Sequence, residues 1–160
     1  MAALDYRDPA RALVLALKLR ARRAAAEPLV DELARAVART GLAGEVVTWV
    51  PGRTRDVRKR GFDHAEVIAR GLAARLGLPV VSLLARSRPR PDQSGLTAAQ
   101  RWTNLEDAFR ARPCWAPTVL VDDLITTGAT AGACARALIA AGAPRVELVA
   151  ACSTEGPDRT

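Results

Sequence analysis

The sequence has few of the residues that define several large classes of protein. Only 4% of its 160 residues are aromatic, one is histidine and three are cysteine. The cysteines, Cys114, Cys134 and Cys152, are odd in number and lack CxxC spacing, so we expect neither a disulfide framework nor a zinc site. The apolar run 12–17 is far shorter than the roughly 20 residues that span a bilayer, and no signal peptide is visible. We therefore expect a cytoplasmic protein without membrane insertion.

The charge of the chain is one-sided and carried by arginine. Lysine and arginine number 24 against 17 acidic residues, a formal charge of +7, yet only Lys18 and Lys59 are lysines. Arginine binds phosphate and carboxylate groups through paired hydrogen bonds. The excess charge therefore indicates an anionic partner, which is a nucleic-acid backbone, a membrane surface or a small phosphorylated ligand. With 49% apolar residues, the chain has enough hydrophobic material for a single domain over residues 1–160.

Strands and helices are expected to alternate along the chain. Apolar periodicity predicts a helix over 9–23 and a second one that follows Pro28, which makes residues 1–44 an N-terminal helical segment. In a core of residues 45–153, strands are indicated at 45–50, 78–84, 118–123 and 146–153, and helices at 63–77, from Thr97, and at 129–142. Residues 154–160 are a tail. This order predicts an α/β fold, an open and mainly parallel sheet with helices on both faces.

The helix expected at 63–77 begins with the spacing of a capping box. Asp63 can accept hydrogen bonds from the first-turn amides, and Glu66 can reach back to the start of the helix. His64, the only histidine, lies in the same turn. A lone histidine in a first helical turn is more often a surface residue than a ligand contact, so we expect His64 at the surface, with contact to a ligand as the alternative.

The segment 119–130, VLVDDLITTGAT, carries the strongest functional signal. A buried strand brings two carboxylates to its carboxyl end, where open α/β sheets place their ligands. Small and hydroxyl-bearing residues then lead into a helix, whose unpaired first-turn amides favour an anion. Carboxylates for vicinal hydroxyls, followed by donors for a phosphate, predict a ribose 5-phosphate site made of Asp122, Asp123, Thr126, Thr127, Gly128, Ala129 and Thr130. A strand that ends in an ordinary polar turn, with Thr127 as a helix cap, is the alternative.

This segment resembles the phosphoribosyl pyrophosphate signature of the type I phosphoribosyltransferases. Three further segments resemble the competence protein F (ComF) family among them: YRDPARALVLALKLR from Tyr6, KRGFDHAEVIARGLAARLGLPV from Lys59, and RSRPRPDQSGLTAAQRWTNLEDAF from Arg86. Together these segments extend roughly from Tyr6 to Ser153. The chain departs from the family in three ways: it has no counterpart of the usual cysteine-rich zinc segment, Asp63 and His64 replace Asn-Gln, and Arg90 replaces a threonine.

The resemblance implies a phosphoribosyl transfer, in which an unidentified nitrogenous acceptor displaces pyrophosphate from phosphoribosyl pyrophosphate with magnesium as cofactor. It implies that Asp122 and Asp123 hold the ribose hydroxyls, directly or through magnesium, and act in catalysis with Arg86 and Arg88 of a segment that closes over the site. The loop 51–62, which has five cationic residues against Asp56, would hold the pyrophosphate. Its pyrophosphate-binding residues would be Arg58, Lys59, Arg60 and Gly61.

Other functions remain open at the level of sequence. A non-catalytic phosphoribosyl pyrophosphate-binding protein, acting in regulation or DNA uptake, would use the same residues. Direct binding of nucleic acid would use the positive charge, and the basic residues Lys18, Arg20, Arg22 and Arg23 have no place in the expected pocket, which leaves a weak contact with single-stranded DNA open. The absence of GxGxxG and GK[ST] motifs argues against dinucleotide-binding and P-loop proteins. A homodimer is one option for the oligomeric state.

Overall fold

A parallel sheet of four strands is the centre of the computed structural model, which describes residues 1–19, 23–87 and 108–154. Its strands β1 (Ala2–Asp5), β6 (Val146–Ser153), β5 (Thr118–Ile125) and β2 (Val46–Trp49) lie side by side in that order. The chain crosses over a helix between successive strands, as parallel pairing requires. The expected strands at 45–50, 118–123 and 146–153 are therefore confirmed. The expected helix from Thr97 lies outside the described residues.

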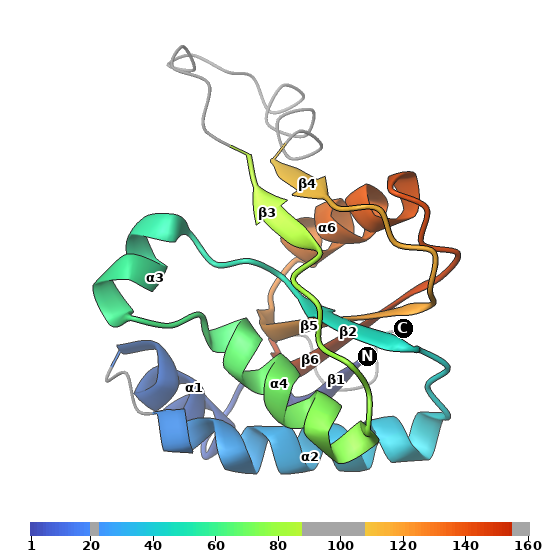
Figure 1. The fold of residues 1–160 in the computed structure, drawn as a ribbon. Helices are drawn as coiled ribbons and strands as arrows, with labels where there is room; N and C mark the ends of the chain where they lie inside the picture. The colour runs from blue at the N-terminus through green and yellow to red at the C-terminus, as the bar shows by residue number, and fades with distance from the viewer. Residues whose placement is uncertain (20–22, 88–107, 155–160) are drawn as a thin grey trace.

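Helices cover both faces of this sheet (Figure 1). On one face α1 (Ala10–Leu19), α2 (Ala26–Thr40) and α4 (His64–Leu76) pack against strand residues such as Val47, Val121 and Val149. On the other face α6 (Ala129–Ala140) packs against the alternate strand positions, which include Val46 and Leu120. Because successive side chains of a strand point to opposite faces, this burial on both sides explains the continuous apolar runs. The predicted α/β class is confirmed.

The N-terminal segment differs from the helical one that we expected. It starts with β1, which pairs with β6 at the edge of the sheet and anchors the Met1 ammonium group to Leu148 O at 2.8 Å. The helix expected over 9–23 ends at Leu19, and a short 3₁₀ helix, Arg23–Ala25, leads into α2. Strand β1 has only four residues and is partly exposed, so its sequence carries no clear alternation of apolar and polar positions.

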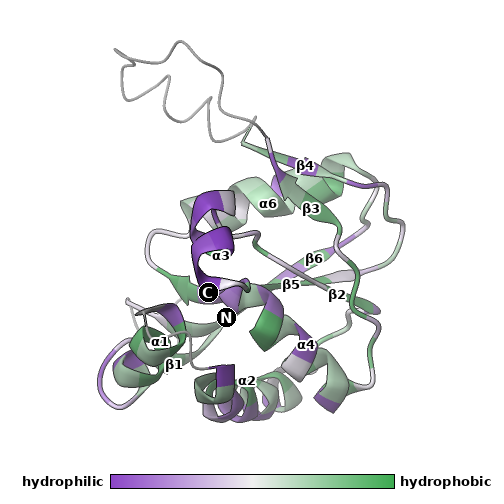
Figure 2. Cartoon of the chain, turned by 60° about the vertical axis from the view of Figure 1, so that its left-hand side comes forward, coloured by the Kyte–Doolittle hydropathy of each residue, from purple (hydrophilic) through white to green (hydrophobic). Residues whose placement is uncertain are grey.

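The prediction that residues 51–62 form a loop is wrong in part, because this segment contains α3 (Thr54–Arg60). None of the residues of α3 is buried, and Figure 2 shows this helix as one of the most hydrophilic parts of the chain. Its arginines and lysine are good helix formers, although such a charged run has no apolar periodicity by which a helix is recognised. Gly61 ends α3 in the left-handed conformation, with φ of 80°.

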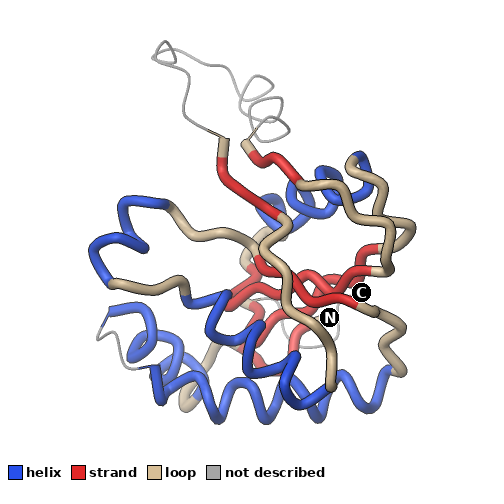
Figure 3. Tube along the Cα trace, in the orientation of Figure 1, coloured by secondary structure: helices blue, strands red, loops and turns tan. Residues whose placement is uncertain are grey.

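The prediction of a strand at 78–84 is also wrong in part. It lies beside β2 only through a bridge between Val47 and Val80, since Pro79 has no N–H to donate to a longer ladder. The chain then forms β3 (Leu84–Arg86), which pairs antiparallel with β4 (Phe109–Ala111) as a separate small sheet (Figure 3). Among the described residues, no helix has the length and apolar character needed to cross a bilayer.

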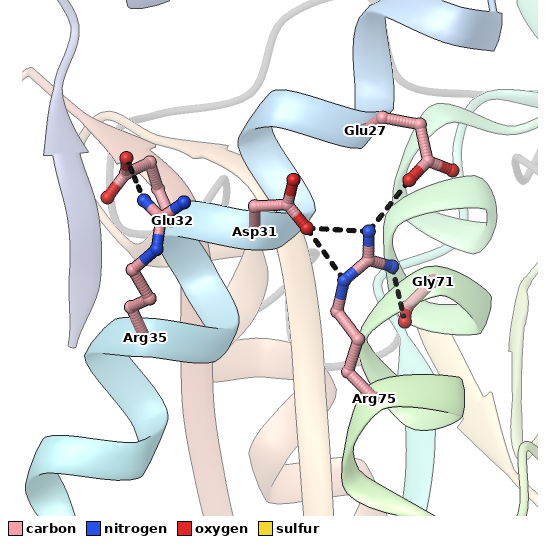
Figure 4. Close-up of polar contacts among 6 residues, drawn as sticks. All are labelled: Glu27, Asp31, Glu32, Arg35, Gly71 and Arg75. Carbon is pink, nitrogen blue, oxygen red and sulfur yellow. Dashed lines mark hydrogen bonds and ion pairs between the residues drawn. The ribbon is translucent and has the colours of Figure 1, made fainter.

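Helices α2 and α4 pack closely at Gly71. Charged residues of the two helices form a network of hydrogen bonds beside it (Figure 4). Arg75 of α4 donates to Asp31 and Glu27 of α2, at 2.8 Å and 2.7 Å, and its third nitrogen donates to Gly71 O. A Cβ at Gly71 would lie 2.9 Å and 3.1 Å from the two methyl carbons of Val30. Val30 is buried and stiff at χ1, so it cannot move aside without cost.

We expect Gly71→Ala to lower the free energy of unfolding by about 1–2 kcal/mol, because overpacking outweighs the gain in helix propensity. Gly132→Ala in α6 is the matched control, since a Cβ there has no contact shorter than 3.6 Å, and it should raise stability by up to about 1 kcal/mol. Urea unfolding followed by circular dichroism measures both. Equal effects of the two substitutions would contradict the close packing.

Candidate functional site

A pocket of about 340 Å³ lies at the carboxyl ends of β2 and β5. Residues 50–52 follow β2 into it, and Arg60 of α3 and the first residues of α4 line its rim. The turn from β5 into α6 forms another wall, and Arg86 of β3 also lines the pocket. This is the edge of the sheet at which α/β proteins place their ligands.

The pocket contains most of the residues that the sequence singled out. Its lining includes the predicted residues Arg60, Arg86, Asp122, Asp123, Thr126, Thr127, Gly128, Ala129 and Thr130. Arg58, Lys59 and Gly61 are not among its lining residues, and Arg88 and Arg90 lie outside the described part of the chain. Lys18 and Asp63, which also line the pocket, were not predicted there, whereas Gly52 belongs to the expected pyrophosphate loop 51–62 and His64 had contact to a ligand as its alternative.

The turn between β5 and α6 presents backbone donors to this pocket. Gly128 has a φ of 71° and precedes the helix without a side-chain cap. The first helical hydrogen bond runs from Gly132 N to Gly128 O at 2.8 Å, so the helix itself leaves the amides of residues 129–131 unused. The Ala129 amide donates a long bond to Thr127 Oγ1, at 3.4 Å. The helix dipole and the remaining amides suit an anion such as phosphate.

Asp123 is held by two basic side chains from other elements. Lys18 Nζ of α1 lies 2.9 Å from its Oδ1, and His64 Nδ1 of α4 lies 3.3 Å from its Oδ2. Burial would raise the pKa of Asp123, but the His64 hydrogen bond and the Lys18 charge outweigh it and lower that pKa. The interpretation of Lys18 as a residue without a place in the pocket is therefore wrong. The apolar stripe of α1 orients this helix, and a single sequence gives no sign of the partner 105 positions away.

Asp122 has a different environment from its neighbour. Burial and the charge of Asp123 together raise its pKa to about 7, although its Oδ1 accepts a hydrogen bond from the Asp123 amide at 2.8 Å. No described side chain forms an ion pair with Asp122. Its ionisation is thus shifted toward neutral pH, and it is the member of the pair without a described basic partner.

The start of α4 connects the 51–62 segment to the aspartates. The Asp63 carboxylate accepts from Ala65 N at 3.2 Å, which confirms it as the helix cap, and from Gly52 N at 2.7 Å. Glu66 pairs with Arg70 one turn later instead of reaching back. His64 is 5% exposed, so its expected surface position is wrong, and its buried Nε2 has no partner within the described structure. Asp63 fixes the first turn that carries His64 inward.

Two arginines, Arg60 and Arg86, line the pocket together with the aspartates. Arg86 donates from Nε to Pro51 O at 2.8 Å, and its guanidinium group lies 4.8 Å from the centre of the Phe109 ring. Burial lowers the pKa of Arg86, which nevertheless stays cationic at neutral pH. Arg60 has a buried Nε without a described partner. Both side chains therefore have donors suited to an anion.

The carboxylate oxygens of Asp122 are suitable ligands for magnesium in a site that also binds a phosphate. Magnesium is usually bound by one or two carboxylates together with oxygens of the substrate and water. Asp122 offers a carboxylate that forms no ion pair with a described side chain, and the described residues contain no cluster of three or more carboxylate, histidine or cysteine ligands. The three cysteines are buried as free thiols, and burial raises the pKa of Cys134 to about 12, so it is no nucleophile at neutral pH.

Solved structures share this fold. Adenine phosphoribosyltransferase from Thermoanaerobacter pseudethanolicus has a TM-score of 0.52 at 16% identity, over 84% of this chain and 83% of that one. The Trypanosoma brucei enzyme, in complex with AMP, pyrophosphate and ribose-5-phosphate, has a TM-score of 0.51 at 16% identity, over 84% and 55% of the two chains. The protein thus has the fold of the type I phosphoribosyltransferases.

Comparison of sequences gives a narrower relationship. The chain is 34% identical over 158 residues to DNA utilization protein YhgH of Salmonella typhi, and 32% identical to the protein of that name from Escherichia coli K12. Each alignment covers 94% of this chain and 70% of the relative. The chain belongs to the family of DNA utilization protein YhgH. No protein-family model matches it.

Proposed function

We propose that this protein binds phosphoribosyl pyrophosphate with magnesium and transfers the phosphoribosyl group to a nitrogenous acceptor, as a ComF-like phosphoribosyltransferase. The observation that carries the proposal is one pocket lined by Asp122, a carboxylate without an ion-pair partner among the described residues, by the anion-binding turn of α6, and by Arg60 and Arg86. A volume of about 340 Å³ is in the range of small-molecule sites. The carboxylate, the phosphate turn and the arginines are the kinds of group that the hydroxyls, the 5-phosphate and the pyrophosphate of such a ligand would need.

Different residues of the pocket would bind different parts of the ligand. Asp122 would accept hydrogen bonds from the ribose hydroxyls, and the turn 126–130 would hold the 5-phosphate through amides and threonine hydroxyls. Arg60 and Arg86 would donate to the pyrophosphate. Asp122 would hold magnesium together with oxygens of the ligand, and the metal would supply positive charge to the leaving pyrophosphate.

The transfer requires stabilisation of positive charge on the sugar as the bond from carbon 1 to pyrophosphate breaks. Asp122 and Asp123 are consecutive residues of β5 that line the pocket, and their carboxylates would, when ionised, favour that charge. The two arginines would stabilise the negative charge that leaves with the pyrophosphate. The positive charge on the sugar and the negative charge on the pyrophosphate would thus each be stabilised by side chains of opposite charge.

Binding of phosphoribosyl pyrophosphate tests the proposal directly. With magnesium present and ligand at about 100 times its dissociation constant, wild type should gain about 2.7 kcal/mol of stability, seen as a thermal shift. The Asp122→Asn/Asp123→Asn variant should lose this shift, while Asp8→Asn, which removes an exposed carboxylate outside the pocket, should keep it. An equal shift in wild type and the double variant would overturn the site.

A non-catalytic protein that acts in the use of DNA is the second candidate function. The name of the relatives supports it, as do the exposed cations of α3, which lie outside the pocket: Arg55, Arg58 and Lys59. Pyrophosphate release in the presence of free bases, ammonia or glutamine separates the two candidates. Tight binding of the ligand without turnover, together with salt-sensitive binding of single-stranded DNA, would favour the second.

A further inference from the structure

Lys18 lines the pocket from the N-terminal helix α1, and no other described side chain of that helix does so. Val14 and Leu17 of this helix are fully buried, which fixes its rotation on the sheet. The next residue, Lys18, therefore extends along the edge of the apolar stripe and reaches the carboxyl end of β5. Its side chain is 29% exposed and ends at Asp123. A partly buried ammonium group without a function in the pocket would more simply extend to solvent.

The contacts of Asp123 leave it little capacity for a metal ion. Each of its two oxygens has a basic partner, Lys18 Nζ at 2.9 Å and His64 Nδ1 at 3.3 Å, and its side chain is only 11% exposed. A divalent ion at either oxygen would lie against the ammonium group and be repelled by it. The neighbouring Asp122 has no such partner, but one carboxylate is too few to hold magnesium without ligand oxygens.

We propose that Lys18 is a built-in cation of the pocket, which occupies the position at Asp123 that a divalent ion would otherwise take, so that magnesium reaches the aspartates only together with a phosphate ligand. Removal of the ammonium group should leave two adjacent carboxylates without a lysine partner. Adjacent carboxylates attract divalent ions. The inference rests on the proposed function only for the identity of the phosphate ligand.

Manganese provides the test, because it prefers the same oxygen ligands and its paramagnetic resonance signal reports the free ion. The titration is done at pH 8 without sugar or phosphate. Wild type and Lys18→Arg should bind manganese too weakly to saturate. Lys18→Met should gain a saturable site, about tenfold tighter or more, and Lys18→Met/Asp123→Asn should lose it again.

Lys59→Met is the matched control, since it removes the other lysine of the chain from an exposed position outside the pocket. It should bind manganese as wild type does. A gain of binding in Lys18→Met thus cannot come from the lower net charge. A merely structural ion pair would leave metal binding unchanged in all of these variants, provided that circular dichroism shows them to be folded.

Two results would overturn the proposal. One is a folded Lys18→Met variant that binds manganese no better than wild type. The other is measured on wild type alone and does not depend on the folding of any variant: saturable manganese binding in the absence of phosphate. Failure of phosphoribosyl pyrophosphate binding would overturn the proposed function and leave the manganese result standing.

Discussion

Asp122→Asn is expected to stabilise the ligand-free protein by about 2–4 kcal/mol at pH 8, even though it removes a residue of the proposed site. The reason is the raised pKa of Asp122, which burial and the charge of Asp123 move from 3.8 to about 7. Ionisation of this group thus opposes folding. Asparagine has the same shape, keeps the oxygen that accepts the Asp123 amide, and carries no charge.

The raised pKa of Asp122 also determines how the difference in stability between wild type and Asp122→Asn should depend on pH. A carboxyl group whose pKa is higher in the folded state favours folding below its unfolded value, and this advantage is lost as the pH rises through the folded value. The stability of wild type should therefore fall relative to that of Asp122→Asn between pH 4 and about pH 7, and the difference should stay constant above. Urea unfolding at pH 4, 6 and 8 measures this. A difference that is independent of pH would contradict the raised pKa.

Asp123→Asn is expected to have the opposite effect and to destabilise the protein by about 2–3 kcal/mol at pH 7. It leaves Lys18 and His64 facing a neutral amide at a site where both are largely withdrawn from water. The loss should be smaller than for a fully buried pair because Lys18 is 29% exposed. The lowered pKa of Asp123 means that its contribution is present above its unfolded value and disappears as the pH falls through the folded one.

A double-mutant cycle separates the Lys18 pair from other effects. Lys18→Met/Asp123→Asn should be more stable than the sum of the single variants predicts, because neither charge is then left alone. Asp31→Asn is a control from the exposed network of Figure 4, and it should cost less than about 1 kcal/mol. Additive losses at Lys18 and Asp123 would show that the two side chains do not interact.

The sequence predicted the parts of the fold in which local pattern and tertiary environment agree. Strands β5 and β6 are buried on both faces, so their composition alone was enough to locate them. Strand β1 and helix α3 were missed because the first is a short edge and the second buries none of its residues. Neither has an apolar pattern: β1 owes its conformation to its pairing with β6, and α3 consists of good helix formers without an apolar face.

The candidate site, like the fold, could be predicted only in part from the sequence. The turn 126–130 follows directly from its strand, and its position beside Asp122 could be predicted from chain order. The contacts of Lys18 and His64 with Asp123 join positions 105 and 59 residues apart, which no local pattern specifies. The histidine prediction relied on the usual place of a first-turn residue. It failed because the Asp63 cap also accepts from Gly52 N, and this fixes the start of α4 against the pocket.

Strand β1 also bears on the order in which the protein can fold as it is synthesised. It pairs only with β6, so its backbone partners at Ala150 and Cys152 emerge from the ribosome almost 150 residues later. Helix α1, which follows it, packs against the 3₁₀ helix and α2 and can make those contacts long before β6 is synthesised. Until β6 emerges, the edge of β1 has no strand partner among the described residues and is exposed on the nascent chain. The first strand of the chain is therefore among the last to be paired.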